Sequence, residues 1–133
     1  MTITDYRQFR DLEKAEVRLF SGARATLEAI TPDPYSAFAR LTDVDFGIRL
    51  TLPREGREDV TYTLWISESG KPMLKQSLIQ QRMVYAALLR LPSVMGEMEP
   101  VEKELCDYLA GNGHPRTYQE LLEMARHFAN MNQ

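Results

Sequence analysis

The chain has 133 residues, 44% of them hydrophobic, with a formal net charge of −3 from 16 basic and 19 acidic side chains. This length and composition predict one compact domain, residues 1–133, with a hydrophobic core of its own. The acidic balance argues against a general affinity for DNA or RNA, because phosphate binding needs clustered Lys and Arg, and no segment approaches the roughly 18 consecutive apolar residues of a membrane span.

The cysteine content and the first residues bear on localisation. Cys106 is the only cysteine, so no intramolecular disulfide can form. The chain begins with Thr2-Ile3-Thr4-Asp5 and lacks the basic and then apolar pattern of a secretory signal. We therefore expect a soluble, cytoplasmic protein that does not associate with a membrane.

The N-terminal residues have helical spacing. Tyr6, Phe9 and Leu12 recur every three residues after the polar pair Thr4-Asp5, which is a favoured helix start. This pattern predicts a short amphipathic helix that ends near Ala15.

Residues 16–30 allow two interpretations. We favour two strands, at 16–20 and 23–30, separated by the turn residues Ser21-Gly22. The second strand rests on an alternation of apolar and polar residues, although its alanines would also suit a longer helix. The apolar members of that alternation are Ala23, Ala25, Leu27 and Ala29.

The clearest β pattern follows the breaker Thr31-Pro32-Asp33-Pro34. Apolar residues alternate with other residues over 44–52 and again over 60–66, and the polar residues 53–59 between them have the composition of a hairpin loop. In the second strand Trp65 is out of phase with the aliphatic residues. It should therefore point to the opposite face of the sheet, where a helix or a partner must cover it.

Three helices are predicted after the sheet, over residues 78–90, 100–109 and 118–129. The first is apolar almost all round, so it should lie across the sheet beneath other elements. Ser77 with Gln80, and Thr117 with Glu120, have the spacing of capping boxes at the first and last of these helices. The predicted fold is α+β: a short N-terminal helix, an antiparallel sheet of three or four strands, and three C-terminal helices packed on one sheet face.

Candidate catalytic residues are few. Asp43 and Asp45 alternate on a strand and could share a side, while His114 and His127 are the two histidines of the chain. A small hydrolase or transferase would need some of these four residues together in a pocket. Cys106 lies among acidic residues that disfavour a reactive thiolate, and no spacing of ligands predicts a metal or cofactor site. We expect a protein that is not an enzyme.

Nucleic-acid binding is a second alternative. Residues 101–128 resemble the first two helices of a helix-turn-helix domain, on the residue patterns of 104–109 and 117–122. In such domains, however, the helix that reads the DNA follows the second one. Direct binding to phosphates would depend on the basic residues between 71 and 90, which are Lys71, Lys75, Arg82 and Arg90. The acidic residues that follow them argue against this alternative.

Our leading hypothesis is a non-catalytic, intracellular protein-binding module, such as an inhibitor, adaptor, immunity or chaperone-like protein of bacterial, phage or plasmid origin. The predicted contact residues are Trp65, the loop methionines Met95 and Met98, and an acidic strip that consists of Glu97, Glu99, Glu102, Glu104 and Asp107. Such a strip would suit a basic partner, for example a nucleic-acid-binding protein. Homodimerisation is kept as a further alternative.

Overall fold

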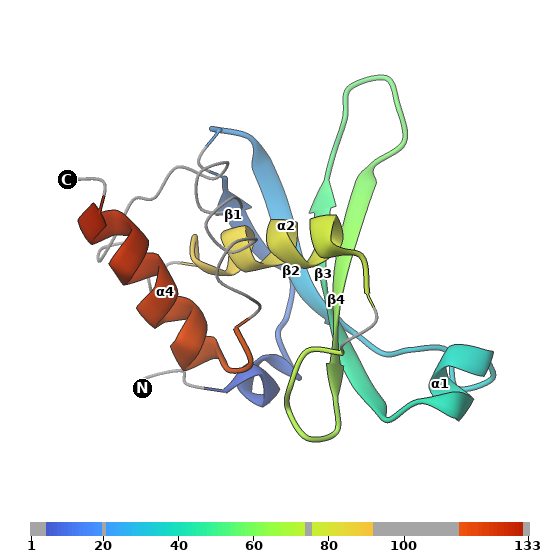
Figure 1. The fold of residues 1–133 in the computed structure, drawn as a ribbon. Helices are drawn as coiled ribbons and strands as arrows, with labels where there is room; N and C mark the ends of the chain where they lie inside the picture. Colours follow the sequence, from blue (N-terminus) through green and yellow to red (C-terminus); the bar gives the residue numbers. More distant parts are fainter. Residues whose placement is uncertain (1–4, 20, 74–75, 92–114, 132–133) are drawn as a thin grey trace.

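The computed structural model describes residues 5–19, 21–73, 76–91 and 115–131. Four strands, β1 (Ala15–Arg18), β2 (Arg24–Ile30), β3 (Val44–Leu52) and β4 (Val60–Ser67), form an antiparallel sheet in chain order (Figure 1). The α+β class is therefore confirmed. The strand interpretation of residues 16–30 is confirmed as well, because β1 and β2 pair with each other there.

The strand register brings the apolar alternation onto one face of the sheet. Leu27 lies opposite Leu50, and Ile48 lies opposite Leu64. All four side chains are fully buried. The period of two in the sequence thus produces one continuous apolar face, which the helices cover.

Helix α2 (Leu78–Leu88) crosses this apolar face from one sheet edge to the other (Figure 1). Near its start the Gln80 side chain accepts a hydrogen bond from the Thr63 N–H of β4 at 3.0 Å. Beyond its end the Arg90 Nε donates to the Arg18 carbonyl of β1 at 2.6 Å. Val84 and the residues 85–88 are completely buried, as expected of a central helix.

Helix α4 (Tyr118–Met131) and a short 3-10 helix, η1 (Tyr6–Phe9), complete the core. Tyr118 donates its hydroxyl hydrogen to the Leu88 carbonyl at 3.2 Å, which joins α4 to the end of α2. Its ring also contacts Phe9 edge-on, with the ring centroids 5.0 Å apart. The N-terminal and C-terminal segments therefore pack against each other and against α2.

The predicted N-terminal helix to Ala15 is wrong in type and length, because the chain forms only the four-residue η1 there. A 3-10 helix has three residues per turn, so Tyr6 and Phe9 reach the core from the same side without an α-helix. The residues that follow η1 then pair with the sheet. The Leu12 carbonyl accepts from the Ala29 N–H at 3.0 Å, and β1 begins at Ala15.

The predicted helix count and order are also wrong. A short helix, α1 (Ala37–Leu41), lies between β2 and β3, where no helix was expected, and it projects beyond the end of the sheet away from α4 (Figure 1). The predicted helices 78–90 and 118–129 correspond to α2 and α4. The predicted helix 100–109 lies outside the described residues.

Both predicted capping boxes form only in part. Ser77 and Thr117 accept from the backbone N–H groups three residues later, as expected of cap residues. The second hydrogen bond of a capping box, from the cap N–H to the side chain three residues later, is replaced in each case. Gln80 binds the Thr63 N–H instead of its own cap, and Glu120 accepts from the N–H of Arg116, one residue before the cap.

Within the described ranges, no helix has both the length and the apolar character needed to cross a membrane.

Candidate functional site

Trp65 lies on the sheet face opposite to the core, as its phase in the alternation predicts. It faces Gly47 across the β3–β4 pair, and the missing side chain of Gly47 leaves room for the indole ring. Phe38 of α1 packs on the indole with the ring centroids 5.2 Å apart and the planes tilted by 54°. Helix α1 therefore covers part of Trp65, which stays half-buried.

Helix α1 forms because local hydrogen bonds fix both of its ends. Ser36 is the N-cap and accepts from the Ala39 N–H at 3.1 Å. At the other end the Thr42 hydroxyl donates to the Phe38 carbonyl at 2.6 Å. A five-residue helix is too short to be stable alone, so these bonds and the Phe38–Trp65 contact must hold it.

Several apolar side chains of α1 and its N-terminal flank are exposed. Tyr35 is 87% exposed, Leu41 is 82% exposed and Phe38 is 37% exposed. No residue of α1 is buried. We call the set of Tyr35, Phe38, Leu41 and Trp65 the α1 surface.

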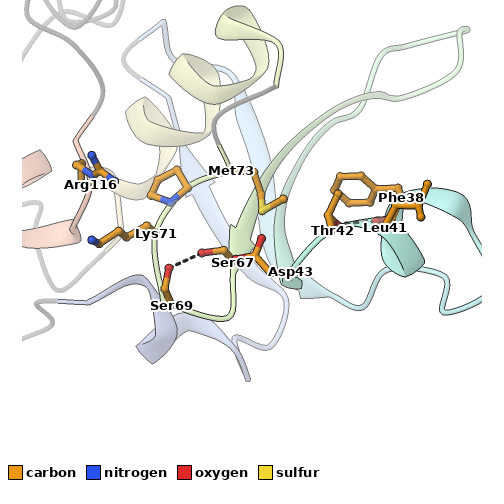
Figure 2. Close-up of a pocket in the computed structure, with 10 residues that line it drawn as sticks. Phe38, Leu41, Thr42, Asp43, Ser67, Ser69, Lys71, Met73 and Arg116 are labelled. Carbon is orange, nitrogen blue, oxygen red and sulfur yellow. Dashed lines mark hydrogen bonds between the residues drawn. The ribbon is translucent and has the colours of Figure 1, made fainter.

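A pocket of about 610 Å³ opens beside the α1 surface (Figure 2). We call it the end pocket, because it lies where β4 ends and β3 begins. Three separate segments line it: residues 38–43, residues 67–73 and Arg116. Lys71 and Arg116 lie at one end, Phe38 and Leu41 lie at the other, and Asp43 and Met73 lie between them (Figure 2).

The residues that follow β4 shape the middle of the end pocket. The Ser67 N–H donates to the Lys71 carbonyl at 2.8 Å, which closes a tight turn. Gly70 has a φ of +84° in this turn, a conformation that side-chain-bearing residues rarely adopt. The turn brings the Ser67 and Ser69 hydroxyls within 2.7 Å of each other on the pocket wall.

The back of this turn rests on the start of η1. The side chains of Arg7 and Asp5 approach Gly70 so closely that a Cβ there would lie 2.7 Å from Arg7 Nε. Asp5 caps η1 and forms a 2.9 Å ion pair with Arg7. The hydrogen bond from Arg7 lowers the pKa of the Asp5 carboxyl, so the carboxylate keeps its charge to a lower pH than usual.

The predicted catalytic residues do not gather in this pocket. Asp43 lines it, whereas Asp45, at an irregularity in the β3–β4 pairing, forms an ion pair with Arg10. His127 is exposed on α4, and His114 lies outside the described residues. Among the side chains that the structure describes, no group of three or more His, Cys, Asp or Glu residues could hold a metal ion.

The basic residues of the nucleic-acid alternative are also spread apart. Lys71 lines the end pocket next to β4, whereas Arg90 binds the Arg18 carbonyl on β1 at the opposite sheet edge. Arg82 is half-buried on α2, and Lys75 lies outside the described residues.

Of the predicted partner-binding residues, the structure describes Trp65 alone. The methionines Met95 and Met98, Cys106 and the whole acidic strip fall in 92–114, outside the described residues. The sequence interpretation missed α1 and the end pocket. The one local signal for α1 was Ser36 as a cap before Phe38 and Leu41, which are three residues apart.

Comparison of the chain with protein-family models, with curated protein sequences and with solved structures finds no match.

Proposed function

We propose that this protein is a non-catalytic protein-binding module and that the α1 surface is part of its recognition surface. The observation that carries the proposal is the exposure of Tyr35 and Leu41, at 87% and 82%, on the projecting helix α1 and its N-terminal flank. Single exposed apolar residues are ordinary on protein surfaces, whereas a cluster on one element is typical of an interaction site.

The construction of α1 supports this role. The Ser36 cap and the Phe38–Trp65 contact hold the helix in one conformation, so Tyr35 and Leu41 are presented in a fixed arrangement. A partner that buries them pays little ordering entropy for this segment. Aromatic side chains such as Tyr35 and Trp65 are also the residue types that contribute most at protein interfaces.

The proposed class is that of an inhibitor, adaptor, immunity or chaperone-like protein acting in the cytoplasm. The test is affinity capture from lysate of the source cells with tagged wild-type protein and the double variant Tyr35→Ser/Leu41→Ser. We expect the wild type to retain a stoichiometric partner at moderate salt and the variant to lose it, because the apolar contact area is removed.

The matched control is Leu78→Ser/Ile79→Ser, which makes the same kind of change at two other exposed apolar residues, at the start of α2. Circular dichroism and thermal melting of all three proteins verify folding. Equal capture of the partner by the wild type and Tyr35→Ser/Leu41→Ser would remove the α1 surface from the proposal. Capture of no stoichiometric partner by the wild type would remove the function.

The acidic strip stays a separate prediction from the sequence. If it contacts a basic partner, the triple variant Glu97→Gln/Glu102→Gln/Glu104→Gln should weaken capture and make it less sensitive to salt. Unchanged affinity in a salt titration of the captured complex would contradict this part of the hypothesis.

A further inference from the structure

We infer that the end pocket binds a small organic monoanion with an apolar tail, of the class of aliphatic or aromatic carboxylates. The inference does not depend on the proposed protein-binding function. The volume of about 610 Å³ is that of a typical small-molecule site, for which the usual range is roughly 300–1,000 Å³. The ligand class follows from what lines the two ends.

The polar end carries two cations that none of the described residues neutralises. Within the described residues, neither the Lys71 ammonium nor the Arg116 guanidinium has an ion-pair or hydrogen-bond partner. Both side chains nevertheless line the same pocket, at the same end (Figure 2). Two like charges kept together in this way favour an anion between them.

The paired serines, which lie between Lys71 and Asp43, add a hydrogen-bond donor to the pocket (Figure 2). Ser67 is only 6% exposed, and its hydroxyl shares one hydrogen bond with that of Ser69. Whichever hydroxyl donates, the proton of the other is not used in that bond. It is available to a carboxylate oxygen held by Lys71 and Arg116.

The remaining charge in the lining selects for a single negative charge. Asp43 faces the middle of the pocket, so the described lining has two positive groups and one negative group. Repulsion from Asp43 keeps an anion at the Lys71–Arg116 end and disfavours a second negative charge further in. The rest of the ligand then extends past Met73 toward Phe38 and Leu41, which are apolar.

Two kinds of ligand combine a carboxylate with an apolar part: a free carboxylic acid and the carboxy-terminal end of an apolar peptide. We would titrate the purified full-length chain with decanoate, butyrate, decanol, and one short apolar peptide in its free-acid and amidated forms, using isothermal titration calorimetry. We expect decanoate, the free-acid peptide or both to bind, because these probes have an anionic group and an apolar part. Decanoate should bind more tightly than butyrate and decanol, and the free-acid peptide more tightly than its amide.

The variant Lys71→Gln/Arg116→Gln should weaken carboxylate binding by about tenfold, since a charge-assisted hydrogen bond contributes about that factor or more. The matched control Lys14→Gln/Arg57→Gln removes the same charge from exposed residues outside the lining and should bind like the wild type. A preference for the peptide or for decanoate identifies the source, and either one supports the inference.

The following outcomes would overturn the inference. These are no binding of any carboxylate, equal affinity for the charged probes and their uncharged counterparts, and equal affinity of the Lys71→Gln/Arg116→Gln variant and the wild type. Binding of butyrate as tightly as decanoate would also overturn it, because the apolar end would then have no role.

Discussion

Gly47 and Gly70 occupy positions where an added Cβ would lie within 3 Å of a neighbouring side chain. Gly47 lies beneath the indole of Trp65, and a methyl group there would lie 2.8 Å from the ring atoms Cε3 and Cζ3. Gly47→Ala should therefore push the indole away from the sheet. We expect the free energy of unfolding to fall by about 1–3 kcal/mol and the fluorescence maximum to shift toward the red.

This prediction is readily checked, because Trp65 is the only tryptophan of the chain. Emission spectra report the exposure of this one side chain, and urea unfolding reports the stability. An unchanged spectrum together with unchanged stability would contradict the close packing of Trp65 on Gly47.

Substitutions at Gly70 and Gly56 allow the cost of a positive φ to be measured apart from the cost of a steric contact. Both have positive φ, +84° and +69°, but a Cβ at Gly56 meets no atom within 4 Å, whereas one at Gly70 meets Arg7 and Asp5. Gly56→Ala should lower the free energy of unfolding by about 1 kcal/mol, the usual cost of this conformation. Gly70→Ala should cost more, because the Asp5–Arg7 pair must also move. Equal losses in urea denaturation would show that the contact with η1 is not restrictive.

At the scale of elements, strand β4 lies at an edge of the sheet, and side chains rather than another strand satisfy part of its backbone. The Gln76 Oε1 accepts from the Trp65 N–H at 2.8 Å, and its Nε2 donates to the Trp65 carbonyl at 3.0 Å. Gln80 accepts from the Thr63 N–H further along the same edge. The part of the edge at Thr63 and Trp65 is therefore not free to pair with another chain.

Gln76→Ala should open this edge. The substitution removes both bonds to Trp65 and a third, from Nε2 to the Met73 carbonyl at 2.8 Å. We expect a loss of about 1–3 kcal/mol in the free energy of unfolding and faster hydrogen exchange of the Trp65 amide, measured by NMR. The control Gln119→Ala alters a glutamine on α4 with a single weak bond to Glu123 at 3.5 Å. Unchanged exchange at Trp65 in the Gln76 variant would contradict the proposed covering of the edge.

How well each element could be predicted depends on where its stabilising contacts lie. The strands β3 and β4 and the outward direction of Trp65 follow from an alternation that is visible in the sequence. Helix α1 could not be predicted with the same ease, because five residues carry little periodicity and a tertiary contact with Trp65 stabilises it. The helix predicted to reach Ala15 failed for a related reason, since the pairing of Leu12 with Ala29 outweighs the local helical pattern.

The end pocket was beyond sequence reasoning because no local spacing encodes it. Its lining comes from residues 38–43, from residues 67–73 and from Arg116, which only the folded chain brings together. Lys71 is one of the four basic residues considered for phosphate binding, but no local spacing relates it to Arg116. A charge pattern read along the chain cannot show which cations share a cavity.

At the scale of the whole molecule, buried tyrosines join the two ends of the described chain to its centre. The ring of Tyr6 in η1 lies 6.3 Å from that of Tyr85 in α2 and 6.2 Å from that of Tyr118 in α4. The Tyr6 hydroxyl also donates to the Pro115 carbonyl at 3.3 Å, 109 residues away in sequence. This cluster closes the fold over the apolar face of the sheet.

The tyrosine cluster should make the protein sensitive to alkali. Burial raises the pKa of the Tyr6 and Tyr85 phenols above the ordinary value of about 10, because a phenolate cannot be solvated in the core. The pKa of each phenol is higher in the folded than in the unfolded chain. Below pH 10 the free energy of unfolding therefore keeps its full contribution from the neutral tyrosines, and this contribution is lost as the pH rises above 10. The loss should be about 1.4 kcal/mol per pH unit for each tyrosine.

Urea denaturation between pH 8 and pH 11 tests this linkage. The free energy of unfolding of the wild type should fall steeply above pH 10, while that of Tyr6→Phe/Tyr85→Phe should fall less, since phenylalanine cannot ionise. The double variant should be less stable at pH 8, because the Pro115 carbonyl loses its donor, so the two curves should converge as the pH rises. Parallel curves would mean that these two hydroxyls reach water in the native protein, which would contradict the packing of η1 against α2 and α4.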